Sequence, residues 1–138
     1  MILITGGCGY VGSHAVARLL ELNQDIVVLD NLSNSSKSVI KQINKISDKK
    51  FKFIHGDLND RTLLISLFKD NKIDTVLHFA GVKSVSESIK FPTKYYLNNV
   101  AGTINLLKVM EQNHVFKLIF SSSATVYDPE NQIPWKEE

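Results

Sequence analysis

A glycine-rich turn between a short apolar run and a helix-like stretch constrains the fold more than any other feature of this sequence. Residues 1–5 are apolar and rich in β-branched side chains, and glycines follow at positions 6, 9 and 12. So tight a turn, and a helix packed closely on a strand, both require residues without Cβ. The N–H groups and positive dipole end of that helix can hold phosphate groups. The pattern therefore predicts a dinucleotide-binding strand–turn–helix unit.

The rest of the chain alternates between short apolar runs and longer helix-like stretches. The runs predict strands at 1–5, 25–29, 51–55, 75–79 and 117–121, and the stretches predict helices at 11–22, 36–47, 60–71, 84–90 and 92–113. Strands without polar alternation are typical of a parallel sheet that is covered on both faces. We therefore predict an α/β fold, a doubly wound Rossmann-like sheet of about five parallel strands flanked by helices. In the last helix, the spacing of three and four residues predicts one apolar face, formed by Val100, Ile104, Leu107 and Met110.

Composition excludes several other classes of protein. The 138 residues are 43% hydrophobic with a net charge of +2, and no apolar run approaches the roughly 20 residues that span a membrane. The single cysteine, Cys8, excludes an internal disulfide and a cysteine-based metal site, so we expect no metal. The start of the chain lacks a basic secretory region, which favours a cytoplasmic location. We interpret the lysines at every fourth position as a solvated helix face and expect no nucleic-acid partner: Lys37, Lys41, Lys45 and Lys49.

Three polar residues stand at the predicted carboxyl ends of strands. Asp30 follows Gly12 by eighteen residues, the spacing of the acid that binds the adenosine ribose, and its charge favours NAD over NADP; the alternative is a turn or cap residue. Asp57 could accept a hydrogen bond from the adenine amino group or cap the next helix. His78 lies in an apolar run, which favours a packed core histidine over a catalytic base.

Four runs of residues resemble one known family. They occupy positions 5–14 (Thr-Gly-Gly-Cys-Gly-Tyr-Val-Gly-Ser-His), 30–34 (Asp-Asn-Leu-Ser-Asn), 78–88 (beginning His-Phe-Ala-Gly-Val-Lys) and 121–127 (Ser-Ser-Ser-Ala-Thr-Val-Tyr). Together they are similar to the UDP-glucose 4-epimerase family of the extended short-chain dehydrogenases/reductases, over essentially the whole chain. The related sugar-nucleotide 4,6-dehydratases carry an Asp-Glu pair where this sequence has Ala124 and Thr125, so dehydratase chemistry is not expected.

The resemblance implies an NAD-dependent isomerase of galactose and nucleotide-sugar metabolism. Members of the family interconvert UDP-glucose and UDP-galactose through a 4-keto intermediate, with tightly bound NAD, and the resemblance implies a homodimer for the full-length proteins. It implies that Ser123 is the catalytic hydroxyl at the sugar 4-OH, whereas the residues alone leave open a strand-end serine that satisfies backbone groups. For Lys83, a solvent-exposed lysine is the alternative to a cofactor contact.

The resemblance also implies cofactor contacts at every strand end. Backbone amides at positions 10–11 would meet the pyrophosphate, residues 30–35 the ribose, residues 57–58 the adenine, and residues 79–83 with position 98 the nicotinamide half. The implied cofactor residues are Gly6, Gly9, Tyr10, Val11, Gly12, Asp30, Asn31, Leu32, Ser33, Asn34, Ser35, Asp57, Leu58, Phe79, Ala80, Gly81, Val82, Lys83, Asn98 and Ser123.

One part of the family pattern is missing from the 138 residues. The family's base is the tyrosine of a Tyr-x-x-x-Lys pair, whose ammonium group stabilises the phenolate. The residues four positions after the four tyrosines are instead His14, Asn99, Val100 and Asn131.

We therefore expect a partial NAD-binding Rossmann domain at 1–127, a polar tail at 128–138, and no substrate-binding portion. The chain alone should then show little or no epimerase turnover. A non-catalytic NAD-binding module and a truncated gene fragment are the alternatives. The apolar fifth strand, around 118–120, is expected to present an exposed edge.

Overall fold

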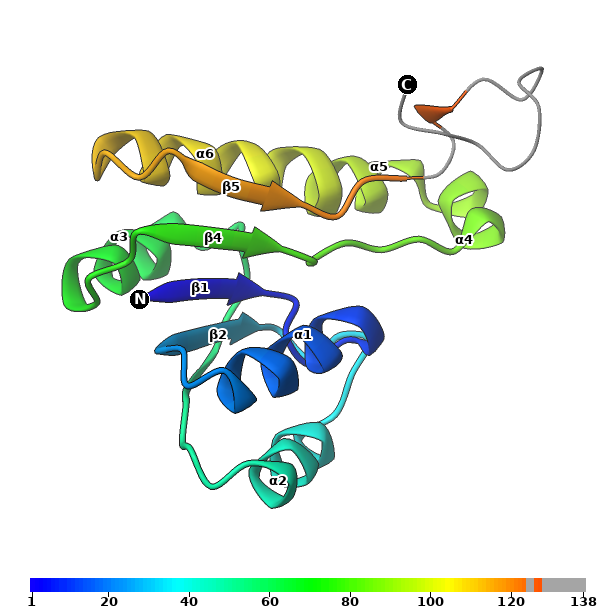
Figure 1. Cartoon of the computed structure of the whole chain (residues 1–138). Coiled ribbons are helices and arrows are strands. Elements are labelled where there is room, and N and C mark those ends of the chain that lie inside the picture. Colours follow the sequence, from blue (N-terminus) through cyan, green and yellow to red (C-terminus); the bar gives the residue numbers. More distant parts are fainter. Residues whose placement is uncertain (124–125, 128–138) are drawn as a thin grey trace.

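The computed structural model describes residues 1–123 and 126–127, and these form a single parallel sheet flanked by helices (Figure 1). The strands are β1 (Ile2–Thr5), β2 (Ile26–Asp30), β3 (Lys52–His55), β4 (Thr75–His78) and β5 (Lys117–Phe120), in the order β3-β2-β1-β4-β5. The predicted doubly wound sheet is confirmed, with strand bounds within one residue or so of those expected. The predicted tail and the Ala124-Thr125 position lie outside the described residues.

The helices cover both faces of the sheet because neighbouring strand residues point to opposite sides. In β1, Leu3 belongs to the core beneath α3 (Arg61–Asp70) and α6 (Gly102–Gln112), and Ile4 to the core beneath α1 (Tyr10–Glu21) and α2 (Lys37–Ile46). Figure 1 shows α1 and α2 together on one side. Side chains fix where helices begin: Asp60 accepts from the N–H of Leu63 at 2.9 Å, and Ser36 accepts from that of Ser38 at 3.2 Å.

The predicted helix at 92–113 is interrupted by a turn that the sequence did not reveal. The region of the predicted helix follows the short α4 (Val85–Lys90). It consists of α5 (Pro92–Tyr95), a π-helical segment η1 (Tyr96–Ala101) and α6. In η1, the N–H of Gly102 donates to the carbonyl of Leu97, five residues back. A π turn accommodates an extra residue and so rotates the helix that follows it.

Only one of the four residues of the predicted apolar face is buried against the sheet. Met110 is buried, but Val100, Ile104 and Leu107 are exposed, by 47%, 44% and 43%. The face toward the sheet instead carries Gly102, Leu106, Val109 and Met110. A Cβ at Gly102 would lie 3.1 Å from the Cβ of Leu58, so the absence of a side chain lets this side of the helix approach the loop after β3, whose Leu58 belongs to the core.

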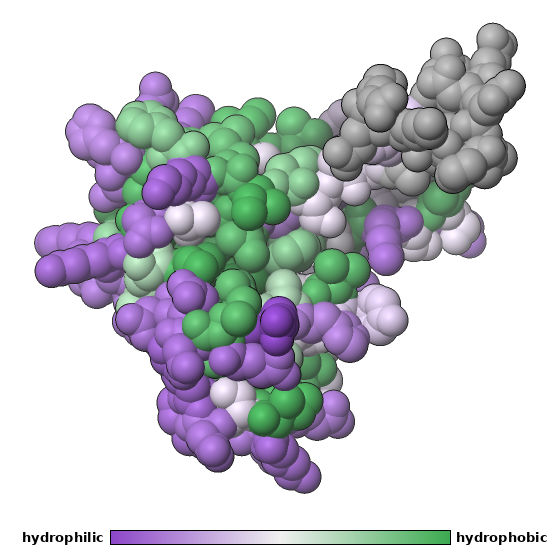
Figure 2. All heavy atoms as spheres, viewed as in Figure 1, coloured by the Kyte–Doolittle hydropathy of each residue, from purple (hydrophilic) through white to green (hydrophobic). Residues whose placement is uncertain are grey.

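Strand β5 lies at the edge of the sheet and has one neighbour, β4, within the described part of the chain. Ile119 and Phe120 are 60% and 53% exposed, and Phe116 before the strand is 75% exposed. The exposed apolar strand expected from the sequence is therefore present. In the same view as Figure 1, Figure 2 shows hydrophobic side chains gathered over the region of α6 and β5.

No helix in residues 1–123 or 126–127 has the length and apolar character needed to cross a membrane. In the same residues, no group of three or more His, Cys, Asp or Glu side chains could hold a metal ion.

Candidate functional site

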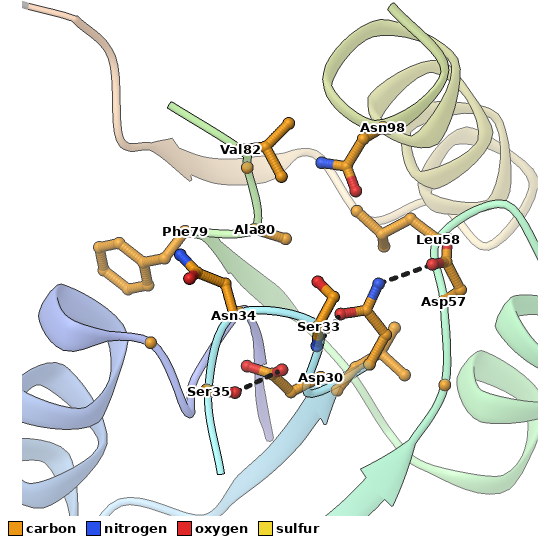
Figure 3. A pocket seen from close by; sticks show the side chains of 16 residues that line it. Asp30, Ser33, Asn34, Ser35, Asp57, Leu58, Phe79, Ala80, Val82 and Asn98 are labelled. Atoms are coloured by element: carbon orange, nitrogen blue, oxygen red, sulfur yellow. Dashed lines mark hydrogen bonds between the residues drawn. The ribbon is translucent and has the colours of Figure 1, made fainter. Parts of the chain in front are cut away.

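A cleft lies over the carboxyl ends of the strands, where the connections that leave the paired strands β1 and β4 run to opposite sides of the sheet. It has two lobes that share Gly6, Gly9, Asn34 and residues 79–82, so they are continuous. The first lobe lies over β2 and β3 (Figure 3), and the second extends past α1 toward β5. A cleft at the point where strand order reverses is the usual ligand site of an open parallel sheet.

The glycine loop brings the start of α1 to this cleft. Gly6 has a φ of +69°, in the left-handed region, and a Cβ there would lie 2.5 Å from the backbone nitrogen of Ala80. A Cβ at Gly12 would overlap the carbonyl of Gly6, so the helix could not approach the loop as it does. Within the described residues no side chain caps the helix, whose N-cap is Gly9. Its first turn lines the second lobe with backbone N–H groups that an anion such as a pyrophosphate can accept from.

Asp30 joins two loops at the end of β2. Its Oδ2 accepts from the N–H of Cys8 at 2.8 Å, and its Oδ1 accepts from the N–H of Leu32 at 2.8 Å and the hydroxyl of Ser35 at 3.2 Å. Because Asp30 bonds the N–H of Leu32, it stabilises the turn after β2, as the alternative interpretation expected, and it also lines the cleft. Burial, and next the charge of Asp30, raise the pKa of the Cys8 thiol to about 12, so Cys8 stays protonated and unreactive near neutral pH.

Asn31 connects this loop to the one after β3. Its side-chain amide donates to Oδ2 of Asp57 at 2.7 Å (Figure 3). Oδ1 of Asp57 accepts from the backbone and side chain of Asn59 at 2.9 and 3.0 Å. Burial opposes ionisation of Asp57, but the hydrogen bonds from Asn59 and Asn31 outweigh it and lower its pKa. The next helix is capped by Asp60, so Asp57 is not its cap. Both carboxylates of the first lobe are thereby held in place by the protein itself.

The loop after β4 is held by an asparagine that the sequence analysis did not single out. Oδ1 of Asn99 accepts from the N–H of Val82 at 2.9 Å, and its Nδ2 donates to the carbonyl of Val82 at 2.8 Å. Asn98 donates to Oδ1 of Asn99 at 2.8 Å and lines the first lobe. The two asparagines are adjacent in η1, so the π turn serves the cleft.

His78 is 2% exposed, as expected for a packed core histidine, and lies beneath the second lobe. Its Nδ1 is 2.5 Å from Oγ1 of Thr5 and its Nε2 is 2.9 Å from Oγ1 of Thr103. Burial lowers its pKa to about 4, so the ring is neutral near pH 7. Both ring nitrogens are engaged inside the protein, which does not suit a base that acts on a substrate.

The second lobe contains a tyrosine that is equally unsuited to act as a base. The hydroxyl of Tyr95 donates to Glu87 at 2.8 Å and accepts from the N–H of Ser84 at 3.0 Å, and Lys94 pairs with Glu87 at 2.6 Å. Desolvation, and next the hydrogen bond and charge of Glu87, raise the pKa of Tyr95. Its phenol therefore keeps its proton near neutral pH.

Every cofactor residue expected from the sequence lines one of the two lobes except Leu32. Leu32 has a φ of +58°, and its side chain packs against the core beneath α1 and α2. Lys83 and Ser123 line the second lobe, and both are exposed. Further residues line the two lobes. The position at a strand end could have indicated Leu29, Gly56 and Phe120, and the runs 78–88 and 121–127 could have indicated five more: Ser84, Val85, Ser88, Ser121 and Ser122. No sequence signal indicated Tyr95, Asn99 and Thr103.

A glycine turn under a helix N-terminus, an acid at the end of β2 and a cleft between β1 and β4, where strand order reverses, define a Rossmann-type dinucleotide-binding fold. Within that class, the chain belongs to the NAD dependent epimerase/dehydratase family, which it matches over residues 2–138.

Known proteins similar to this chain agree with that assignment. The UDP-glucose 4-epimerases of Haemophilus influenzae and Yersinia enterocolitica are 50% and 53% identical to it, in each case over 99% of the chain. The crystal structure of the UDP-glucose 4-epimerase from Bifidobacterium longum in complex with NAD⁺ and UDP superposes with a TM-score of 0.94 and 43% identity, over 99% of the chain. The chain spans about 40% of the length of these three relatives.

Proposed function

We propose that residues 1–127 are the NAD-binding part of an isomerase of the UDP-glucose 4-epimerase type. The observation that carries the proposal is the position of Asp30, a residue that is 8% exposed and whose carboxylate bonds both the glycine loop and the loop after β2. A carboxylate there accepts from ribose hydroxyls and repels a 2′-phosphate. High identity to epimerases over 99% of the chain supports the particular reaction.

The lining residues fit an extended dinucleotide. The first turn of α1 would hold the pyrophosphate, Asp30 and the loop after it the adenosine ribose, and Asp57 with Leu58 the adenine. Residues 79–83 with Asn98 would hold the nicotinamide half. The chemistry that NAD supplies when bound is reversible removal of hydride from C4 of the sugar of a UDP-hexose.

Ser123 is the residue of this chain that we assign to the sugar. It follows β5 at the cofactor end of the sheet and lines the second lobe. From there its hydroxyl can hydrogen-bond the sugar 4-OH and help to move its proton. The 138 residues contain no Tyr-x-x-x-Lys pair, and Tyr95 is held as a phenol. We therefore expect the chain alone to bind NAD without converting UDP-glucose to UDP-galactose.

The test is a calorimetric titration of the purified chain with NAD and, as the matched ligand, NADP. We expect NAD to bind and NADP to bind at least about tenfold more weakly, because of the charge of Asp30. Equal affinities would contradict the role of Asp30. An absence of heat and of a thermal shift at millimolar NAD would contradict the proposal as a whole.

A non-catalytic NAD-binding module is the second candidate function. The hydrogen bonds that keep Tyr95 protonated suit it, and Ser123 at the cofactor end of β5 favours the isomerase. Incubation of UDP-glucose with the purified, sequence-verified chain, followed by assay for UDP-galactose, tests our expectation. Measurable conversion would show that the Tyr-x-x-x-Lys pair is dispensable here.

We also propose that the protein functions as a homodimer, in the cytoplasm. An exposed apolar stripe supports dimerisation: Leu97, Val100, Ile104 and Leu107, which are between 43% and 55% exposed, recur at spacings of three and four along η1 and α6. Such a stripe is typical of helix–helix contacts between subunits. A cytoplasmic location suits the proposed use of NAD and nucleotide sugars in galactose metabolism.

A further inference from the structure

A chain of hydrogen bonds runs beneath the second lobe, from β1 through β4 to η1. It connects Thr5, His78 and Thr103 by the two ring contacts described above, and Oγ1 of Thr103 donates to the carbonyl of Asn99 at 2.6 Å. A hydroxyl has one hydrogen, so Thr103 must accept from Nε2–H of His78. Nδ1 of His78 then has no proton and accepts from the hydroxyl of Thr5. The direction of every bond in the chain is therefore determined.

The last hydrogen bond of this series is made to Asn99, the residue that holds the loop after β4. Asn99 bonds both backbone groups of Val82, and Val82 lines both lobes of the cleft. The carbonyl of Asn99 lies in the π turn, a distortion that is often found at functional sites. A π turn needs local support, because its backbone hydrogen bonds do not follow the register of the helix on either side.

We propose that His78 and Thr103 are positioning residues for the cofactor cleft. They hold η1 in the register in which Asn99 bonds Val82 and Asn98 faces the first lobe. The effect on the cofactor rests on the proposed NAD binding, whereas the effect on Val82 belongs to the chain without a ligand.

The surroundings of His78 support a dedicated role over simple packing. The ring contacts residues of β1, β5 and α6: it bonds Thr5 and Thr103, and the ring of Phe120 packs against it, tilted by 40° at a centroid distance of 5.4 Å. A side chain that merely filled this space could be apolar. A histidine there supplies one donor and one acceptor on opposite sides of a rigid ring, which is what the two threonine hydroxyls require.

The test uses two variants of one residue. Thr103→Val keeps the shape of the side chain and removes the hydroxyl, whereas Thr103→Ser keeps the hydroxyl. Amide hydrogen exchange of Val82, measured by NMR without NAD, should be about tenfold faster in Thr103→Val, because the loss of a buried hydrogen bond raises the population of the open state. Thr103→Ser should stay within about threefold of the wild type, and the NAD affinities should follow the same order.

Each outcome decides the matter. Equal exchange at Val82 in the two variants overturns the proposal, and so does faster exchange in Thr103→Val with unchanged NAD affinity. If the wild-type chain does not bind NAD, the proposed function fails, but the exchange rates still test whether Thr103 supports Val82.

A measurement on the unaltered chain serves if Thr103→Val does not fold. The ¹⁵N shifts of the His78 ring should show a neutral ring with its proton on Nε2. A proton on Nδ1 would overturn the proposed direction of the bonds and with it the role of the pair.

Discussion

The two lobes of the cleft obtain their shape in different ways. In the first lobe, the carboxylates connect neighbouring loops directly: Asp30 bonds the glycine loop at Cys8, and Asp57 bonds Asn31 of the loop after β2. In the second, the lining depends on support from beneath, through His78 and Thr103, and on β5, which has one strand neighbour in the described part of the chain. Hydrogen bonds among its own lining residues thus hold the first lobe, whereas the order of the second depends on η1 and β5. This difference predicts which substitutions affect the whole cleft and which affect one lobe.

The largest effect should come from Gly6, which both lobes share. Gly6→Ala places a Cβ against the backbone of Ala80 and requires a left-handed backbone from alanine. The two penalties, about 1–2 kcal/mol for the backbone and about 1–3 kcal/mol for the overlap, should lower the free energy of unfolding by about 2–5 kcal/mol. Urea denaturation measures it.

Gly81→Ala is the matched control, since its Cβ would meet Oδ1 of Asn99 at an ordinary 3.6 Å. We expect it to change the free energy of unfolding by no more than about 0.5 kcal/mol. Equal destabilisation by the two substitutions would show that the close approach of Gly6 to the backbone of Ala80 is not needed for stability.

The next effect is an acid sensitivity of the second lobe. His78 has an ordinary pKa of 6.5 and a folded value of about 4, so the unfolded chain takes up a proton first as the pH falls. The resulting stability is fully present above pH 6.5 and is lost as the pH falls through about 4; at about 1.4 kcal/mol per pKa unit it amounts to at most about 3 kcal/mol. Asp57, with its lowered pKa, acts only at lower pH.

Urea denaturation of the wild type and of His78→Gln between pH 7 and pH 4 measures this effect. The stability of the wild type should fall more steeply with acid than that of the variant, whatever the difference between them at pH 7. Parallel curves would mean that His78 is not kept neutral in the folded protein.

A smaller effect should be confined to the first lobe. In Asp30→Asn, an NH₂ group replaces one of the two carboxylate oxygens. This donor then faces another donor, either the N–H of Cys8 or the N–H of Leu32 with the hydroxyl of Ser35. We expect a loss of about 1–3 kcal/mol in the free energy of unfolding and a smaller preference for NAD over NADP. Thermal unfolding and the two titrations measure these changes.

Asp25→Asn is the control, because Asp25 is an exposed carboxylate paired only with Lys49, at 2.9 Å, among the described residues. We expect it to leave the cofactor preference unchanged. If it altered that preference as Asp30→Asn does, the discrimination would come from net charge and not from the position of Asp30.

The same contrast between the lobes explains what could be predicted from the sequence. The first lobe is built from residues at fixed distances along the chain from a strand end, so the glycine turn, Asp30 and Asp57 could be found by counting. Leu32 was included because it lies among contacting residues, but its positive φ turns its side chain toward the core.

The support of the second lobe could not be found in this way. Asn99 and Thr103 reach the cleft only because of a π turn, and nothing in the sequence of residues 96–101 distinguishes that turn from an ordinary helix. The helix also carries two apolar faces, and spacing alone does not say which one packs on the sheet. The close approach of Gly102 to Leu58 decides it, and that is a tertiary contact.

The smallest effect on stability should come from the exposed apolar surfaces, where the readout is association. Ile119 on β5 and Ile104 on α6 are 60% and 44% exposed, and a lysine at either position should change the free energy of unfolding by no more than about 0.5 kcal/mol. An unpaired strand edge allows open-ended association, whereas a helix stripe allows a closed dimer. In sedimentation velocity, Ile119→Lys should therefore remove species larger than a dimer, and Ile104→Lys should remove the dimer. Ile65→Lys, at a 45% exposed position of α3, is the control for added charge. If Ile119→Lys alone yielded monomers, β5 and not α6 would be the contact surface, and the second lobe would be completed by a neighbouring strand.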